Sequence, residues 1–188
     1  GSIDKGLKEE ELPDIIKQWR AASPAITKFW WDVDRAANKA LDTGKMQTAG
    51  RLKIGYYDHK LFICLPSGRK LAYIEPEKRL NSFNRMELTY MGVGKTRKWE
   101  RIMTYGPKLV ENCIQAIARD ILAEAMLRVD ATGFDIVAHV HDEMIVEVPN
   151  GKSSVKELCD MMAESPDWVD DKLPLRADGY ECEWYRKD

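Results

Sequence analysis

Three titratable residues in succession are the most chemically suggestive feature of this sequence. His141, Asp142 and Glu143 interrupt a stretch of alternating apolar residues that includes Val137 and Ile145. Such alternation predicts an antiparallel β-hairpin with the three polar residues at its tip. We expect Val137 and Ile145 to be buried, which would hold the tip rigidly. A rigid, exposed aspartate is a suitable ligand for Mg²⁺, which takes carboxylate oxygens together with substrate phosphates.

The spacing also limits what this tip can do alone. Neighbouring strand residues point to opposite faces, so Asp142 and Glu143 are not expected to bind one ion together. A magnesium site would need a second carboxylate from elsewhere in the fold. Taken by themselves, three consecutive polar residues more often form a solvated turn, and the residues alone leave that alternative open.

The elements that must position the tip follow from hydrophobic periodicity. Helical spacing of apolar residues predicts helices over 9–22, 24–41, 107–132 and 154–164. Alternation predicts strands over 52–56, 61–65, 85–91 and 99–103, the hairpin over 136–148, and a last strand or two within 173–184. Ser23 and Ser154 are predicted N-caps, and Gly44 and Gly133 lie just beyond helix ends. The elements together predict an α+β fold.

The first two predicted helices should pack against each other. Their apolar residues fall on one side of each helix, and they include Trp19, Trp30 and Trp31. We therefore expect these tryptophans in the core rather than as platforms for bases.

Composition excludes several classes of protein. The chain has 188 residues, with 29 Lys and Arg against 31 Asp and Glu, so its net charge of −2 points to no polyanionic partner. Its four cysteines form no C-x-x-C pair, which argues against a zinc site and a disulfide framework and favours reduced thiols. Since no apolar run reaches the roughly 20 residues of a membrane-spanning helix, we expect an intracellular protein.

A nucleic-acid surface would therefore have to be local. A basic cluster beside Trp99 could line a duplex by neutralising its phosphates, and a solvated polar face is an equal alternative. The cluster comprises Lys95, Arg97, Lys98 and Arg101, with Arg51, Lys53, Arg69 and Lys70 as further candidates.

The same region contains part of a phosphate-binding loop pattern. Gly94-Lys95-Thr96 matches the end of G-x-x-x-x-G-K-[ST], but Thr89 stands in place of the first glycine. A helix should follow at once, whereas residues 97–105 alternate like a strand. An NTPase is therefore not favoured.

Several blocks of the chain together resemble family A DNA polymerases, especially those of phages. The blocks are Thr104–Asn112, Gln115–Asp120 and Val140–Glu143, and Leu65–Tyr73 resembles the hairpin that those enzymes place before their long helix. The order and spacing of the blocks also match, from about Asp14 onward.

This resemblance implies a partial right-hand polymerase fold, with fingers-derived helices and β-hairpins over 1–105 and a palm portion over 106–188. It implies that Asp142 is catalytic and ligates one of two Mg²⁺ ions, with Glu143 in a supporting catalytic role. His141 would contact the primer strand. Gln115 and Arg119 would face the product duplex, where minor-groove acceptors allow base pairs to be tested without reading sequence.

The sequence also departs from the family. The other catalytic motif, Asp-Tyr/Phe-Ser-x-Ile-Glu, and the nucleotide-binding fingers helix are absent from residues 1–188. The resemblance thus implies a fragment that is inactive alone, because phosphoryl transfer depends on metal ions and cations placed around the phosphates. Its partners would be a missing N-terminal polymerase portion, primer–template DNA and deoxynucleoside triphosphates in the bacterial host cytoplasm.

Other functions stay open. The chain could be a non-catalytic DNA-binding or assembly module of a split polymerase, and a stand-alone metal-dependent nuclease is a weaker alternative. Whether the isolated chain is itself an enzyme is undecided. An apolar surface left without its partner could also make the fragment dimerise.

Overall fold

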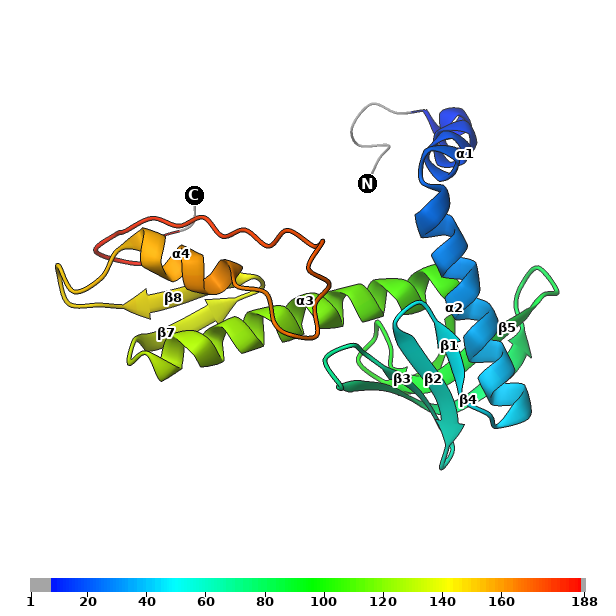
Figure 1. Cartoon of the computed structure of the whole chain (residues 1–188). Helices are drawn as coiled ribbons and strands as arrows, with labels where there is room; N and C mark the ends of the chain where they lie inside the picture. Colours follow the sequence, from blue (N-terminus) through cyan, green and yellow to red (C-terminus); the bar gives the residue numbers. More distant parts are fainter. Residues whose placement is uncertain (1–7, 187–188) are drawn as a thin grey trace. The chain divides into compact units, whose positions relative to one another are not determined.

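Alternating apolar residues between positions 47 and 104 form a six-stranded antiparallel meander. The computed structural model describes residues 8–186 and orders these strands as they follow in the chain (Figure 1). They are β1 (Gln47–Ala49), β2 (Leu52–Tyr57), β3 (Lys60–Cys64), β4 (Lys70–Leu80), β5 (Met86–Val93) and β6 (Trp99–Thr104). The predicted α+β class and the predicted hairpin around residues 66–69 are confirmed.

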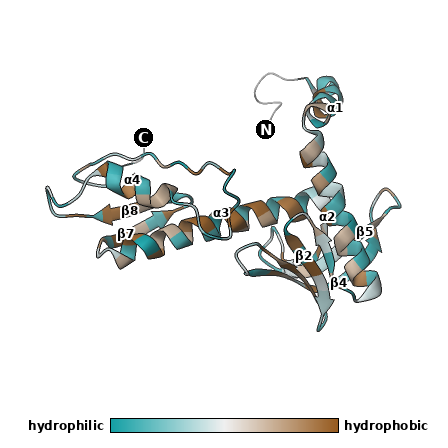
Figure 2. Ribbon diagram, in the orientation of Figure 1, coloured by the Kyte–Doolittle hydropathy of each residue, from teal (hydrophilic) through white to brown (hydrophobic). Residues whose placement is uncertain are grey.

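Helix α2 (Pro24–Thr43) covers one face of this sheet near β1 and β2. Its inward residues Val33, Ala37 and Ala40 are fully buried, as are Ile54 and Ile63 on the facing strands. Figure 2 shows hydrophobic positions among polar ones on β2, as expected for a strand with one buried face. The helix ends as predicted at Gly44, whose φ of 65° is the left-handed conformation that glycine adopts without strain.

Helix α1 (Leu12–Ala22) follows a short 3₁₀ turn, η2 (Glu9–Glu11), and contacts α2 as predicted. Trp19 stacks on Trp30 with ring centroids 5.5 Å apart. The expectation of a tryptophan core is wrong for Trp19 and Trp31, however, because both side chains are exposed and α1 has no buried residue. A two-helix contact covers only one side of each ring.

Ser23 occupies the predicted N-cap position of α2 but does not cap the helix through its side chain. The residue is shared between two helices: its N–H closes α1 on the Trp19 carbonyl at 3.0 Å. The Thr27 hydroxyl donates back to the Ser23 carbonyl at 3.3 Å.

The long helix α3 (Gly106–Ala131) belongs to two compact units. Unit 1 comprises the described residues up to Leu65 together with Lys70–Cys113, and unit 2 comprises Pro66–Arg69 and the described residues from Ile114 onward. The assignment of these parts to fingers and palm stays a prediction.

Unit 2 contains the predicted hairpin, β7 (Asp135–Val140) and β8 (Glu143–Glu147), and helix α4 (Val155–Ala163). Ser154 caps α4 as predicted, since its Oγ accepts from the Glu157 N–H at 3.2 Å. The Glu157 carboxylate accepts from the neighbouring Ser153 hydroxyl at 2.9 Å.

The predicted strand within residues 173–184 is wrong, because the tail has no regular secondary structure. Pro174 cannot donate to a strand ladder, and neither sheet includes this segment. The tail instead runs close to α4, where a Cβ on Gly179 would lie 3.1 Å from Val155 Cγ1.

All four cysteines are free in the structure. No helix within residues 8–186 is both long and apolar enough to cross a membrane.

Candidate functional site

The β7–β8 hairpin has a two-residue turn made of His141 and Asp142. Val140 pairs with Glu143, so Glu143 is the first residue of β8. His141 has a φ of 53°, which the tight hairpin turns require at their first central position. Both turn residues are exposed. The predicted location of the polar residues at a hairpin tip is confirmed.

The expected burial beside the tip is wrong for Val137. Ile136 pairs with Val146 and Ala138 pairs with Ile145, so Val137 is the extra residue of a β-bulge. A bulged residue leaves the alternation of the strand, and Val137 is 55% exposed. Ile145 is half-buried. The tip is therefore positioned by its tight turn and strand pairing rather than by burial on both strands.

The carboxylates of the tip do not form a metal site by themselves. No group of three His, Cys, Asp or Glu side chains within residues 8–186 is arranged to hold a metal ion. Asp142 would supply only part of the octahedral ligand set of Mg²⁺. The Glu143 carboxylate instead accepts from the Tyr185 hydroxyl at 3.4 Å. Desolvation and the nearby Glu143 charge raise the pKa of the Tyr185 phenol.

Arg119 on α3 contacts β7, which brings one predicted DNA-binding residue near the tip's strand. Its Nη1 and Nη2 lie 3.2 and 3.3 Å from His139 Nδ1 and Nε2. A neutral imidazole can accept through one of those nitrogens only. Gln115 precedes Arg119 by four residues and is also exposed on α3. The structure thus places Arg119 beside His139, a residue to which the sequence assigned no role.

Asp120 fixes the turn between β3 and β4 to α3. Its carboxylate accepts from the Ser67 hydroxyl at 2.6 Å and pairs with Arg69 Nε at 2.6 Å. Arg69 Nη2 also donates to the Ala116 carbonyl at 2.7 Å. Two sequence blocks that carry the polymerase resemblance therefore meet in unit 2, and the exposed Arg69 is already paired with Asp120.

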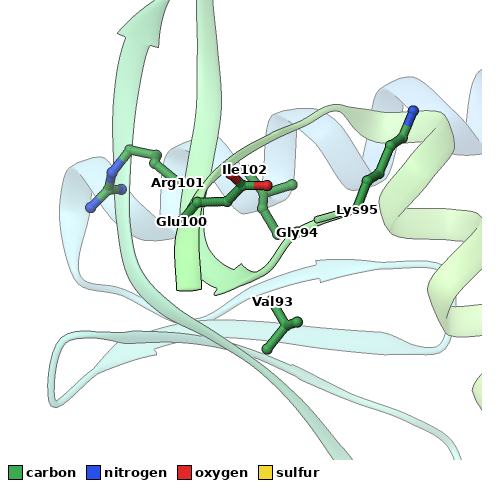
Figure 3. Close-up of a pocket in the computed structure, with 6 residues that line it drawn as sticks. All are labelled: Val93, Gly94, Lys95, Glu100, Arg101 and Ile102. Atoms are coloured by element: carbon green, nitrogen blue, oxygen red, sulfur yellow. The ribbon is translucent and has the colours of Figure 1, made fainter. Parts of the chain in front are cut away.

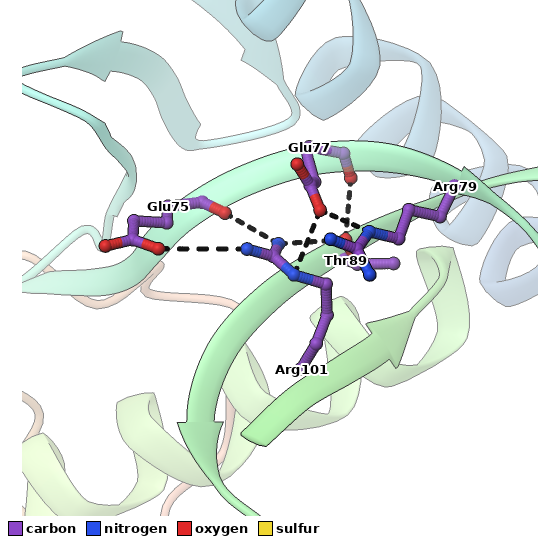
Figure 4. A network of polar contacts seen from close by, with 5 residues as sticks. All are labelled: Glu75, Glu77, Arg79, Thr89 and Arg101. Carbon is purple, nitrogen blue, oxygen red and sulfur yellow. Dashed lines mark hydrogen bonds and ion pairs between the residues drawn. The ribbon is translucent and has the colours of Figure 1, made fainter. Parts of the chain in front are cut away.

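Arg101, which belongs to the predicted basic cluster, is also engaged in contacts within the fold. It donates to the Glu75 carbonyl at 2.9 Å and the Thr89 hydroxyl at 3.2 Å, and pairs with Glu77 Oε1 at 3.0 Å (Figure 4). Arg79 pairs with the same Glu77 carboxylate. These contacts join β4, β5 and β6 around a bulge at which Glu75 has a φ of 46°.

The segment that resembles a phosphate-binding loop is a hairpin turn. Gly92 and Val93 end β5, the Gly94 N–H donates to the Lys98 carbonyl at 2.9 Å, and β6 follows instead of a helix. A hollow of about 400 Å³ is lined here by Val93, Gly94, Lys95, Glu100, Arg101 and Ile102 (Figure 3). This geometry does not present the row of backbone amides of a P-loop.

Known proteins similar to this chain include a phage DNA polymerase. No protein-family model and no solved structure matches the chain. In an alignment of 190 residues, the whole chain is 44% identical to a DNA polymerase of Bacillus phage SP02. The chain spans 29% of the length of that polymerase. It is therefore similar, over its full length, to one part of a phage DNA polymerase.

Proposed function

We propose that this chain is the C-terminal part of a family A DNA polymerase, a partial right-hand fold in which unit 2 contributes to the palm. The observation that supports this most strongly is the 44% identity over the whole chain to a phage DNA polymerase. The exposed Asp142 on a two-residue hairpin turn is compatible with a catalytic carboxylate that must reach substrate. The proposed reaction transfers deoxynucleotides from their triphosphates to a primer 3′ end, in the cytoplasm of a bacterial host.

In this proposal the hairpin tip faces the primer terminus. Asp142 would hold Mg²⁺, and bound magnesium would neutralise the charge that develops on the reacting phosphates. Glu143, held by Tyr185, would stay beside the site in a supporting role. His141 would contact the primer strand, and its position in the turn leaves its ring exposed for this purpose.

The exposed side of α3 would follow the product duplex. Gln115 and Arg119 are one helical turn apart, so their side chains share a face. An amide and a guanidinium can both donate to the acceptors of the minor groove, which are nearly independent of sequence. Contact with His139 would limit the freedom of Arg119 before DNA binds.

Primer extension tests the proposal. The chain is assayed with Mg²⁺, primer–template and all four deoxynucleoside triphosphates, with and without a polypeptide that carries the remaining polymerase motifs. We expect extension only in the combined sample. Asp142→Ala should lower its rate more than about 100-fold, because metal ligation contributes several kcal/mol to charge stabilisation.

Asp135→Ala is the matched control, because Asp135 is an exposed aspartate at the other end of the same hairpin. Its extension rate should be that of the wild type. Full extension by Asp142→Ala, or equal losses in both variants, would contradict the proposed role of Asp142.

A non-catalytic DNA-binding or assembly module of a split polymerase is the second candidate. It is favoured by the arrangement of the tip, whose carboxylates do not belong to a metal-binding cluster within the described part of the chain. DNA binding without extension in the combined sample would support this candidate over the first.

A further inference from the structure

The turn between β5 and β6 presents three cations without ion-pair partners in the described chain. Lys95, Arg97 and Lys98 are exposed, and no carboxylate among residues 8–186 pairs with them. Figure 3 shows Lys95 extended away from the turn. Arg101 and Arg69, by contrast, are both neutralised within the fold. We call residues 93–99 the basic turn.

An apolar surface adjoins these cations on one face of the hairpin. Val93 and Trp99 are directly paired across the two strands, so their side chains lie on the same face. Val93 is 64% exposed and Trp99 is 60% exposed. A large, exposed indole beside several free cations is unusual for a solvated turn, since tryptophan normally buries its ring.

The basic turn is a defined structure rather than a loose loop. The Gly94 N–H donates to the Lys98 carbonyl at 2.9 Å, and the Arg97 N–H donates to the Gly94 carbonyl at 3.0 Å. The Glu100 side chain packs against Gly94 so closely that a Cβ there would lie 1.5 Å from its Oε1. Glu100 is the one acidic side chain in this hollow, and it leaves an excess of positive charge on the turn.

Below the turn, the Arg101 contacts hold β4, β5 and β6 together (Figure 4). The strands that carry the basic turn are therefore fixed at their base. The backbone of the turn would therefore lose little conformational entropy on binding, although the exposed lysine and arginine side chains would still be ordered.

We propose that the basic turn binds single-stranded nucleic acid, with Trp99 stacking on an unpaired base and Lys95, Arg97 and Lys98 neutralising phosphates. Stacking on an aromatic side chain next to backbone-tracking cations is the usual way to hold a single strand without reading its sequence. A base within a duplex is already stacked, so a duplex would use the cations but not the indole. The choice of nucleic acid over an anionic membrane rests on the proposed polymerase function, in which a template strand would be the single-stranded ligand.

Fluorescence anisotropy of the chain with a labelled oligodeoxythymidine tests this proposal without any primer extension. We expect the isolated chain to bind the single strand more tightly than a blunt duplex of the same length. Trp99→Ala should weaken single-strand binding about tenfold, and Trp99→Phe should recover most of it. Trp31→Ala, which removes an exposed indole from α2, should have no effect.

The charge contribution is measured separately. A triple variant, Lys95→Gln, Arg97→Gln and Lys98→Gln, should reduce the slope of log affinity against log salt by about 2, because each phosphate contact on a single strand contributes about 0.7. The control triple is Lys17→Gln, Arg20→Gln and Lys39→Gln, which makes the same change in net charge on the exposed surfaces of α1 and α2. It should leave the slope unchanged.

Equal losses in the two triple variants would overturn the proposal. Equal affinity for duplex and single strand, together with no effect of Trp99→Ala, would also overturn it. So would binding to anionic phosphatidylserine vesicles but not to DNA. None of these results bears on the polymerase proposal, which primer extension by the combined sample tests separately. Failure of extension with Trp99-dependent binding intact would contradict the proposed function alone.

Discussion

A single added methyl group would not fit at Gly106. A Cβ there would lie 2.3 Å from the Trp30 carbonyl oxygen and 2.9 Å from Asp34 Cβ, so the first residue of α3 lies directly on the backbone of α2. We expect Gly106→Ala to lower the free energy of unfolding by about 1–3 kcal/mol, because backbone cannot move aside as a flexible side chain can. Denaturant unfolding followed by circular dichroism measures this.

Gly44→Asn is the control for Gly106→Ala. Nothing lies within 4 Å of a Cβ at Gly44, and asparagine tolerates its left-handed backbone. A loss as large as that of Gly106→Ala would mean that the close approach of the two helices is not the cause.

Asp34 gives the stability of unit 1 a pH dependence. Burial raises the pKa of this carboxyl above 3.8, although the Gly106 N–H bonds to it and opposes the shift. The folded state therefore holds the proton more tightly than the unfolded state, and Asp34's contribution to stability is lost as pH rises through its folded pKa. Asp34→Asn should gain stability relative to the wild type as pH rises from about 3.8.

Asp32→Asn is the control, and its stability relative to the wild type should change with pH in the opposite direction over the same range. The hydrogen bond from Lys28 lowers the pKa of Asp32, so this carboxylate stabilises the fold only once it is ionised. Its variant should lose stability relative to the wild type as pH rises. Parallel pH profiles for the two variants would contradict both assignments.

At the residue scale, the sequence predicted the position of the candidate site but not its contacts. A polar interruption in an alternating stretch is a local pattern, and it located His141 and Asp142 in the turn. Arg119 meets His139 across 20 residues, and Ser67 meets Asp120 across 53. No spacing rule links such residues, because the contacts depend on how α3 packs with the turns around it.

At the scale of elements, Arg128 closes the end of α4. Its guanidinium donates to the Met161 carbonyl at 3.2 Å and to the Glu164 carbonyl at 2.6 Å, where the last carbonyls of the helix lack partners. Arg128→Ala should lower the free energy of unfolding by about 1 kcal/mol, since the partly buried Met161 carbonyl and the exposed Glu164 carbonyl both lose a charged donor. Thermal or denaturant unfolding measures the change.

The matched control is Lys156→Ala on α4 itself. Lys156 forms an exposed pair with Asp160 four residues away. Such pairs contribute about 0.5 kcal/mol or less, so this variant should unfold nearly as the wild type does. A larger effect for Lys156→Ala than for Arg128→Ala would show that the carbonyl contacts do not hold α4.

Elements with local signals were the predictable ones. Helix ends at Gly44 and Ser154, and hairpins with polar turns, follow from residue types within a few positions. No strand was predicted from periodicity over β4, because its bulge, with Glu75 at positive φ and contacted by Arg101 from β6, interrupts the alternation. The tail alternates like a strand, but a strand also needs a partner, and sequence periodicity contains no information about an available edge.

At the scale of the molecule, apolar surface on β7 is left uncovered by the described residues. The hairpin forms a two-stranded sheet, so β7 has one edge without strand partners in the structure. Val137 stands out from this strand at the bulge, and Val140 is also exposed. Unpaired strand edges with exposed apolar side chains favour association with another chain.

We therefore predict that the isolated chain associates with itself through β7. Sedimentation equilibrium should show an average mass that rises with concentration. Val137→Lys should lower the association constant about tenfold or more, because it puts a charge where a valine would be buried and removes roughly 1.5–3 kcal/mol of favourable burial.

Leu127→Lys makes the same kind of change on α3, at a side chain that is 70% exposed, and should leave association unaltered. A wild-type chain that stays monomeric at every concentration, or equal effects of the two variants, would exclude β7 as the contact. Addition of a polypeptide carrying the remaining polymerase motifs should compete with self-association if the same surface is used in the longer protein, since one strand edge can pair with only one partner.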